Sequence, residues 1–204
     1  MKENEKLFGK MSSHLAEYDY LTGLPNRRGL YEFYDILESK DSIHAMFIDI
    51  DNFKRVNDIY GHSMGDECIA KLIEENVSGF TSRIGGDEFV ALIDGNMTED
   101  ELKSTAETLL RQMENIDFRK DILSNVSLSI GIVTRQRVST MLDDILHKCD
   151  SAMYEAKYDG KNRYVFFREN DKKVQRNRNM EIEMDDALKN GEFIAYLQPK
   201  VNMI

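Results

Sequence analysis

The segment IHAMFIDID, residues 43–51, constrains the fold more than any other part of this sequence. Its residues are mostly apolar until two acids close the segment. A strand with few polar positions is typical of a strand that is buried on both faces of a sheet. The segment therefore predicts a centrally buried strand, with its acids at the point where the chain leaves the sheet.

Periodicity and turn residues predict the other elements, since the chain has only two prolines and we find no internal repeat or low-complexity tract. The expected order is a helix over 3–17, a helix over 27–40, the strand 43–51, a helix over about 62–78, a hairpin over about 80–94, a helix opening at Thr98, a strand over 125–134, a helix over 140–160 and a strand over 163–167. This order favours an α/β fold, an α+β sandwich with a mixed central β-sheet flanked by helices.

Length and composition limit the domain count and the classes of partner. A chain of 204 residues with 41% hydrophobic content can build one full domain core and a piece of a second. Its net charge of −10 argues against broad electrostatic binding to nucleic acid or to an anionic membrane surface. No apolar run approaches the roughly 20 residues that span a bilayer, and Cys68 and Cys149 form no metal-binding spacing. We therefore expect a cytoplasmic chain with reduced cysteines, no nucleic-acid partner and no membrane span.

The hairpin segment RIGGDEFVALID, residues 83–94, carries two glycines and two acids between apolar runs. Gly85 and Gly86 allow positive φ and a close approach of the backbone to a ligand. Asp87 and Glu88 follow them directly. An ordinary turn with solvated acids explains the same residues, because Gly and Asp are common in turns. The hairpin alone leaves both interpretations open.

Asp49 and Asp51 stand two apart at the end of the buried strand and therefore point the same way. Adjacent like charges cost energy unless a cation or solvent screens them, which favours a divalent ion. If the hairpin lies beside this strand, Asp49 and Asp87 can share Mg²⁺ on the phosphates of a nucleotide. Phe53 at a ligand position argues against an EF-hand loop, whereas solvated strand-end acids remain an alternative.

The segment NDIYGHSMGDE, residues 57–67, places Asn57 and Asp66 on either side of a turn. A carboxylate can accept hydrogen bonds from the ring N–H and the amine of guanine, while an amide serves another polar edge atom. A helix cap is the alternative, because Asp66 falls in an expected first helical turn. The phosphate-binding patterns GxxxxGK[ST] and GxGxxG are absent. Three lysines are candidate phosphate contacts: Lys54, Lys157 and Lys161.

Six segments together resemble the GGDEF domain of diguanylate cyclases, in order and spacing, across residues 19–167. They are DYLTGLPNRR (19–28), FIDIDNFKRVND (47–58), YGHSMGDE (60–67), RIGGDEF (83–89), SLSIGI (127–132) and AMYEAKYDGKNR (152–163). The resemblance implies a fold similar to the nucleotidyl cyclase and polymerase palm. It also implies condensation of two GTP molecules to cyclic di-GMP and pyrophosphate, in bacterial second-messenger signalling. Because each site of the family holds one GTP, it implies a homodimer as the active form.

The resemblance also implies roles for individual residues. The ligands of Mg²⁺ or Mn²⁺ would be Asp49, the backbone carbonyl of Ile50 and Asp87. Glu88 would support the hairpin or a metal, and the expected catalytic residues are Asp87, Glu88 and Asp49. Asn57 and Asp66 would recognise guanine, and the remaining substrate-binding residues would be Lys54, Phe53, Gly85, Gly86, Lys157 and Lys161. Lys161 stands where the family often has arginine, which keeps the charge but weakens a bidentate grip.

One segment departs from the family pattern. The product-inhibition motif RxxD of the family is replaced by NVSG at residues 76–79. Asn76 and Gly79 supply neither of the two charges of that motif. We therefore expect no feedback inhibition through this site.

The ends of the chain have their own predictions. Residues 1–18 are expected to be an N-terminal signalling helix or linker, and residues 168–180 a charged linker. Residues 181–204 are expected to be the truncated N-terminal part of an EAL-like domain, because ALKNGEFIAYLQPKVNM (187–203) resembles the opening of an EAL phosphodiesterase domain. This part stops before the catalytic motifs of that domain. An alternative function follows, in which the GGDEF-like domain is a catalytically weak GTP-binding module that regulates an adjoining EAL domain.

Overall fold

The computed structural model describes residues 16–37, 42–53, 73, 75–115, 126–137, 139–169, 187–188 and 190–192. Contacts divide the chain into two compact units, Met1–Phe167 and Arg168–Ile204, and all five named strands belong to the first. Most of the expected helices over 3–17 and 62–78 lies outside the described residues. The same holds for Cys68 and for most of residues 168–204, so the linker and EAL-like assignments stay predictions.

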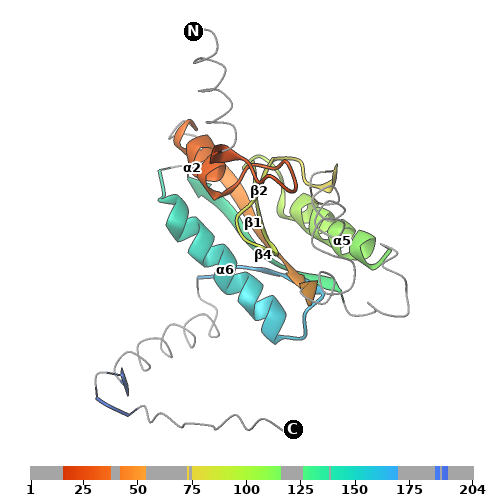
Figure 1. Ribbon diagram of the computed structural model, residues 1–204. Helices are drawn as coiled ribbons and strands as arrows, with labels where there is room; N and C mark the ends of the chain where they lie inside the picture. The colour runs from red at the N-terminus through yellow and green to blue at the C-terminus, as the bar shows by residue number, and fades with distance from the viewer. Residues whose placement is uncertain are drawn as a thin grey trace, which may run out of the picture. The chain divides into compact units, whose positions relative to one another are not determined.

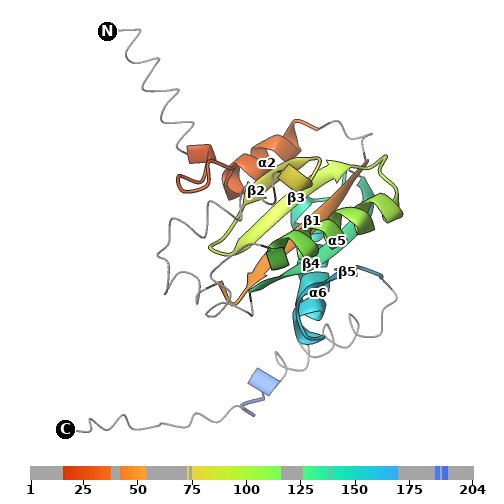
Figure 2. The ribbon, with the colours of Figure 1, turned by 90° about the vertical axis from the view of Figure 1, so that its right-hand side faces the viewer.

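Five strands form one mixed sheet in the order β2-β3-β1-β4-β5 (Figure 2). The central strand β1 (Ser42–Asp51) pairs antiparallel with β3 (Glu88–Asp94) and with β4 (Ser127–Arg137). β2 (Phe80–Arg83) pairs antiparallel with β3, and β5 (Arg163–Phe166) pairs parallel with β4. Every residue of β1 after the first is buried, so the predicted central strand is confirmed.

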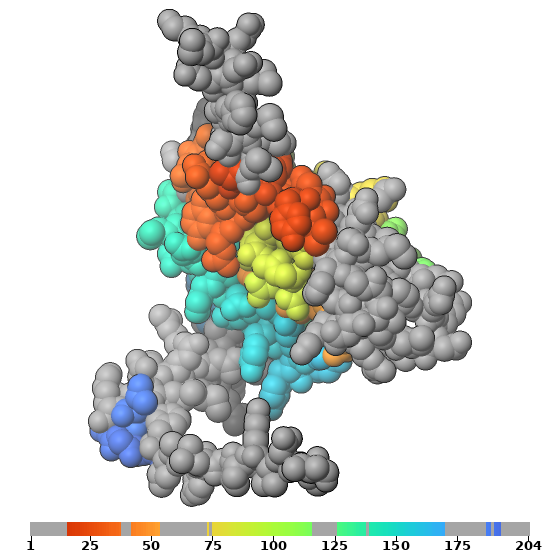
Figure 3. All heavy atoms as spheres, viewed as in Figure 1, coloured from red at the N-terminus to blue at the C-terminus, as the bar shows by residue number. Residues whose placement is uncertain are grey.

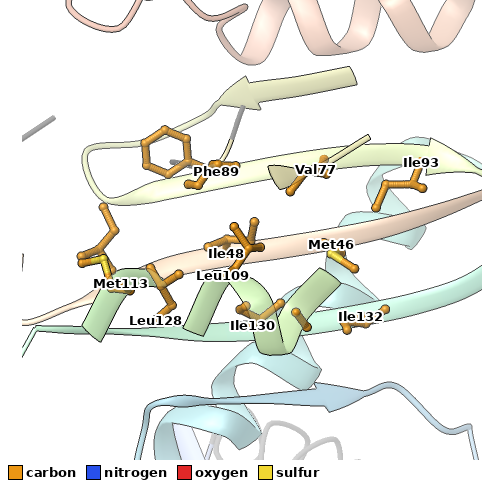
Figure 4. Close-up of a cluster of buried hydrophobic side chains, with 14 of the residues drawn as sticks. Met46, Ile48, Val77, Phe89, Ile93, Leu109, Met113, Leu128, Ile130 and Ile132 are labelled. Atoms are coloured by element: carbon orange, nitrogen blue, oxygen red, sulfur yellow. The ribbon is translucent and has the colours of Figure 1, made fainter. Parts of the chain in front are cut away.

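Helices cover both faces of this sheet. α6 (Leu142–Tyr158) and α2 (Arg27–Asp35) pack on one face, and α5 (Glu99–Asn115) packs on the other (Figure 1). Side chains alternate along β1, so Met46 and Ile48 enter the core under α5 while Ala45 and Phe47 enter the core under α6. Figure 4 shows the α5 core. The expected sandwich with a mixed sheet is therefore confirmed.

Two helix starts follow from capping residues. The Asn26 side chain accepts a hydrogen bond from the Gly29 amide at 3.1 Å and begins α2. Thr98 and Glu101 exchange backbone-to-side-chain hydrogen bonds of 2.7 and 3.3 Å, a capping box that begins α5 where the sequence predicts a helix opening at Thr98. The expected helix over 27–40 was too long. α2 ends at Asp35, because the Ile36 amide donates to the carbonyl of Phe33, three residues earlier, as in a 3₁₀ turn.

Gly131 in β4 lets α6 lie directly on the sheet. A Cβ at this position would be 2.0 Å from the carbonyl oxygen of Cys149 and 2.4 Å from the backbone nitrogen of Met153. Cys149 is a free cysteine buried at this contact, and burial raises the pKa of its thiol. Only a residue without a side chain lets the α6 backbone approach β4 this closely. This short distance between helix and strand sets the position of Lys157 in the last turn of α6.

We expect Gly131→Ala to lower the free energy of unfolding by roughly 1–3 kcal/mol, because the new methyl group forces the α6 backbone away from β4. Urea denaturation measures this change. Gly86→Ala is the matched control, since a Cβ there would meet no heavy atom within 4 Å. An equal loss in both variants would contradict the packing argument.

Candidate functional site

The end of β1 and the tip of the β2–β3 hairpin lie side by side. Asp49 is directly opposite Glu88 in the β1–β3 register. The Ile50 amide donates a hydrogen bond of 3.1 Å to the Asp87 carbonyl. The hairpin therefore lies beside the strand, as the sharing of an ion between Asp49 and Asp87 requires.

Asp49 is a buried acid that pairs with a lysine. Its side chain is 5% exposed, and the Lys157 Nζ lies 2.7 Å from its Oδ2. Burial raises the pKa of Asp49 to about 6; the bond to Lys157 lowers this pKa, and the charges of Asp87 and Asp51 raise it. The ionised carboxylate is thus poorly solvated, so a further cation at this place would stabilise it.

The donor atoms at this place fit a divalent cation. The carboxylates of Asp49 and Asp87 and the carbonyl of Ile50 are oxygen donors, which Mg²⁺ and Mn²⁺ prefer. Within the described ranges, no group of three or more His, Cys, Asp or Glu side chains is assembled to hold a metal. Mg²⁺ is commonly bound by one or two carboxylates together with substrate phosphates.

The two hairpin glycines do not use positive φ, and this part of the prediction was wrong. The positive-φ glycines in the described part of the chain are Gly23, Gly160 and Gly191. Gly85 provides space instead, because a Cβ there would lie 2.5 Å from the Oε2 of Glu88. The carboxylate of Glu88 therefore folds back over the turn, a position that suits the predicted support of the hairpin.

Arg83 holds the hairpin tip, and the sequence prediction missed it. Its guanidinium donates to the carbonyls of Gly85 and Gly86 at 3.2 and 2.5 Å and pairs with Asp19 at 3.1 Å. Its backbone amide donates to the Pro25 carbonyl at 2.8 Å. Arg83 thus joins the N-terminal turn to the tip. The only sequence signal was an arginine two residues before the first hairpin glycine, since its acid lies 64 positions away.

The remaining predicted site residues fall into three groups. The Lys161 Nζ donates to the Asn52 Oδ1 at 3.2 Å, so this lysine lies at the exit of β1. The Phe53 side chain is buried in the α5 core, which leaves only its backbone for a ligand. The others lie outside the described residues: Lys54, Asn57 and Asp66.

The segment that replaces the product-inhibition motif has a structural role. The Asn76 side chain donates to the Gln112 Oε1 at 2.7 Å. A Cβ at Gly79 would lie 2.3 Å from the Leu92 carbonyl oxygen, so substitution of this glycine disturbs the sheet. Tests for nucleotide binding at this place should therefore use Asn76 alone.

A mixed five-stranded sheet with flanking helices, with acids at the end of its central strand and on the neighbouring hairpin, is a palm-like α/β fold. Residues 16–163 match the family described as "Diguanylate cyclase, GGDEF domain". The chain therefore belongs to the GGDEF family, and its homologues include diguanylate cyclases of cyclic di-GMP signalling.

Two curated relatives illustrate the range of this family. The chain is 33% identical over 174 residues to diguanylate cyclase DgcM of Escherichia coli, covering 79% of this chain and 41% of DgcM. It is 30% identical over 197 residues to cyclic di-GMP phosphodiesterase PdeR of the same organism, covering 92% of this chain and 30% of PdeR. The chain thus spans less than half the length of these relatives, and they differ in named activity.

A solved structure supports the fold. The GGDEF domain of TpbB (YfiN) from Pseudomonas aeruginosa superposes with a TM-score of 0.63 at 28% identity, covering 78% of this chain and 99% of that domain. Among the residues that the structure describes, no helix is both long and apolar enough to cross a membrane.

We expect Arg83→Lys to lower the free energy of unfolding by roughly 3 kcal/mol, because the one nitrogen of lysine cannot reach the three acceptors that three guanidinium nitrogens contact. Hydrogen exchange of residues 83–89 should accelerate in the same variant. Arg28→Lys is the control, since Arg28 forms an exposed pair with Glu32. Unchanged exchange at the tip would show that Arg83 does not hold it.

The raised pKa of Asp49 predicts a pH dependence of the metal-free protein. The folded state binds this proton more tightly than the unfolded state, so Asp49 takes away stability as pH rises from about 4 to about 6. Lys157→Met removes the group that lowers the pKa, so the loss should grow and extend above pH 6. Urea denaturation across pH 4–8 and carboxyl NMR of Asp49 measure both effects.

Lys103→Met is the control for this experiment, because the pair that Lys103 forms on α5 is exposed and has a separation of 3.9 Å. A difference between Lys157→Met and the unchanged protein that stays constant with pH would contradict the assigned cause.

Proposed function

We propose that this chain is a diguanylate cyclase domain that condenses two GTP molecules to cyclic di-GMP with Mg²⁺ or Mn²⁺, as a homodimer. The observation that carries the proposal is the buried Asp49, which has a pKa of about 6 and lies beside the hairpin that bears Asp87. Family membership supports the same chemistry. A buried acid that needs a cation is the expected element of a phosphoryl-transfer site.

In the proposed reaction, the 3′-hydroxyl of one GTP attacks the α-phosphate of the other. A new phosphorus–oxygen bond forms, the bond to pyrophosphate breaks, and the hydroxyl proton leaves; a second such step closes the ring. A bound divalent ion would stabilise the charge that develops on the phosphate and the nucleophile. Asp49, the Ile50 carbonyl and Asp87 would hold this ion.

The protein's other residues orient and neutralise the substrate. Lys157 and Lys161 place two ammonium groups near the exit of β1 in an otherwise acidic chain, which favours phosphate binding there. Arg83 holds the tip that presents Asp87. Glu88 folds over Gly85 and supports the same turn. Asn57 and Asp66 remain the proposed guanine contacts and Lys54 a further phosphate contact.

Dimerisation is part of the proposal because one site holds one GTP and the reaction needs two. In Figure 3 the yellow-green segment that includes the hairpin reaches the surface between the orange N-terminal segment and the cyan α6. That exposure supports a facing arrangement of two domains, in which each brings one nucleotide to the other.

The second candidate is a GTP-binding module that regulates an adjoining EAL phosphodiesterase domain. The relative PdeR, a named phosphodiesterase that is 30% identical over 92% of this chain, favours it. The resemblance of residues 181–204 to the start of an EAL domain supports it further. This candidate predicts GTP binding without cyclic di-GMP synthesis.

We expect Asp87→Ala to lower cyclic di-GMP formation by about 100-fold or more, because the variant loses a ligand of the catalytic ion. The assay incubates GTP and Mg²⁺ with protein over a wide concentration range and detects cyclic di-GMP by chromatography. Product in the unchanged protein should rise faster than linearly with protein concentration. Asp100→Asn, in the exposed first turn of α5, is the control.

Bound GTP without product at any protein concentration would replace the cyclase proposal with the regulatory module. Full activity in Asp87→Ala would remove Asp87 from the catalytic site.

A further inference from the structure

Two turns next to the candidate site have backbone conformations that residues with side chains rarely adopt. Asn52, directly after β1, has a φ of 62°. Lys161 and Asn162, in the turn after α6, have φ of 65° and 48°, and Gly160 precedes them at 113°. Left-handed residues other than glycine persist where their surroundings hold them in place. The contacts of Asp51 identify what holds them.

Asp51 is 2% exposed and accepts hydrogen bonds on both carboxylate oxygens. The Ser127 hydroxyl donates to Oδ2 at 2.7 Å, and the Ser129 hydroxyl lies 3.0 Å from each oxygen. The backbone amide of Asn162 donates to Oδ2 at 3.4 Å. Asp51 therefore joins β1, β4 and the turn after α6.

These contacts continue a row along the face of β1 that α6 covers. The Cys149 Sγ donates to the Ala45 carbonyl at 3.5 Å, and the Lys157 Nζ pairs with the carboxylate of Asp49, four residues further along the strand. The turn after α6 then meets Asp51, two residues beyond Asp49. Side chains two apart on a strand share a face, so the row follows the strand to its end.

A second contact joins the same two turns. The Lys161 Nζ donates to the Asn52 Oδ1 at 3.2 Å. Asp51 and Asn52 at the end of β1 therefore contact Asn162 and Lys161, respectively, in the turn after α6. We propose that Asp51 is a positioning residue that fixes the Lys161 ammonium at the exit of β1 for contact with nucleotide phosphate. This inference rests on the proposed function, because it takes GTP as the ligand.

Asp51 is distinguished from Asp49 by its partners. Asp49 has a lysine partner and a pKa that burial raises, whereas Asp51 accepts bonds from two hydroxyl groups and an amide. A carboxylate that these neutral donors satisfy does not need a metal ion for its stabilisation. Asp51 therefore acts through Lys161, and its removal should match the loss of that lysine.

The first readout needs no nucleotide. Asp51→Asn exchanges an acceptor oxygen for a donor group, so we expect the Asn162 amide to lose protection from hydrogen exchange by about tenfold. Asp94→Asn is the matched control, since Asp94 accepts only local bonds from Asn96 in the described structure. Ser127→Ala, which leaves the carboxylate intact, should give a smaller change in the same direction and serves if Asp51→Asn does not fold.

The second readout is a double-mutant cycle with Lys161→Met, followed by the dissociation constant of GTP measured by calorimetry with Ca²⁺. Each single variant should weaken GTP binding by about tenfold, and the double variant should be no weaker than Lys161→Met alone. If the protein is a cyclase, the KM for GTP should rise in Asp51→Asn while kcat changes little.

Four results would overturn the proposal. Unchanged exchange at Asn162 would show that Asp51 does not hold the turn, whether or not the protein is a cyclase. Additive losses in the double variant would show that Asp51 acts independently of Lys161, and a fall in kcat with weakened Mg²⁺ dependence would make Asp51 a metal ligand. Absence of GTP binding to the unchanged protein would also overturn the proposal, because the proposal takes GTP as the ligand of Lys161. Bound GTP without product leaves this proposal intact and contradicts only the cyclase.

Discussion

The close packing of α6 on β4 at Gly131 is the contact on which the rest of the site depends. Because no side chain separates the helix from the strand there, the last turn of α6 brings Lys157 to Asp49. The turn that follows reaches Asp51 and Asn52. A shift of the helix away from the sheet would move every one of these groups together, so fold stability and site geometry are coupled through one glycine.

Two acids on one face of a strand are stabilised in different ways. Asp49 has a pKa that burial raises and pairs with the Lys157 ammonium, so a further cation there would stabilise its charge. Asp51 is satisfied by hydroxyl and amide donors and ties three parts of the backbone together. The hairpin is stabilised in a third way, since Arg83 donates hydrogen bonds to the tip carbonyls and so holds the turn that carries Asp87 and Glu88. Rigid support of this kind is what positioning of a reacting phosphate requires.

Much of the fold could be predicted from the sequence because its signals are local. The apolar run of β1, the glycines of the hairpin and the Thr98–Glu101 capping box each predict their element from neighbouring residues. The length of α2 could not be predicted, because its end depends on a tightened last turn that the residue pattern does not reveal. The role of Gly85 was misjudged for a similar reason, since its neighbour in space is the folded-back Glu88 side chain.

The sequence by itself determined the family, the order of most strands and helices and the acids at the exit of β1, since these follow from spacing and residue type. Only the tertiary structure decided that Asp49 faces Lys157, that Asp51 faces Ser129 and Asn162, and that Arg83 pairs with Asp19. These partners lie far apart along the chain and meet because the sheet, α6 and the N-terminal turn bring them together. The pKa of Asp49 is set by its burial and by its contact with Lys157, and both exist only once that packing has formed.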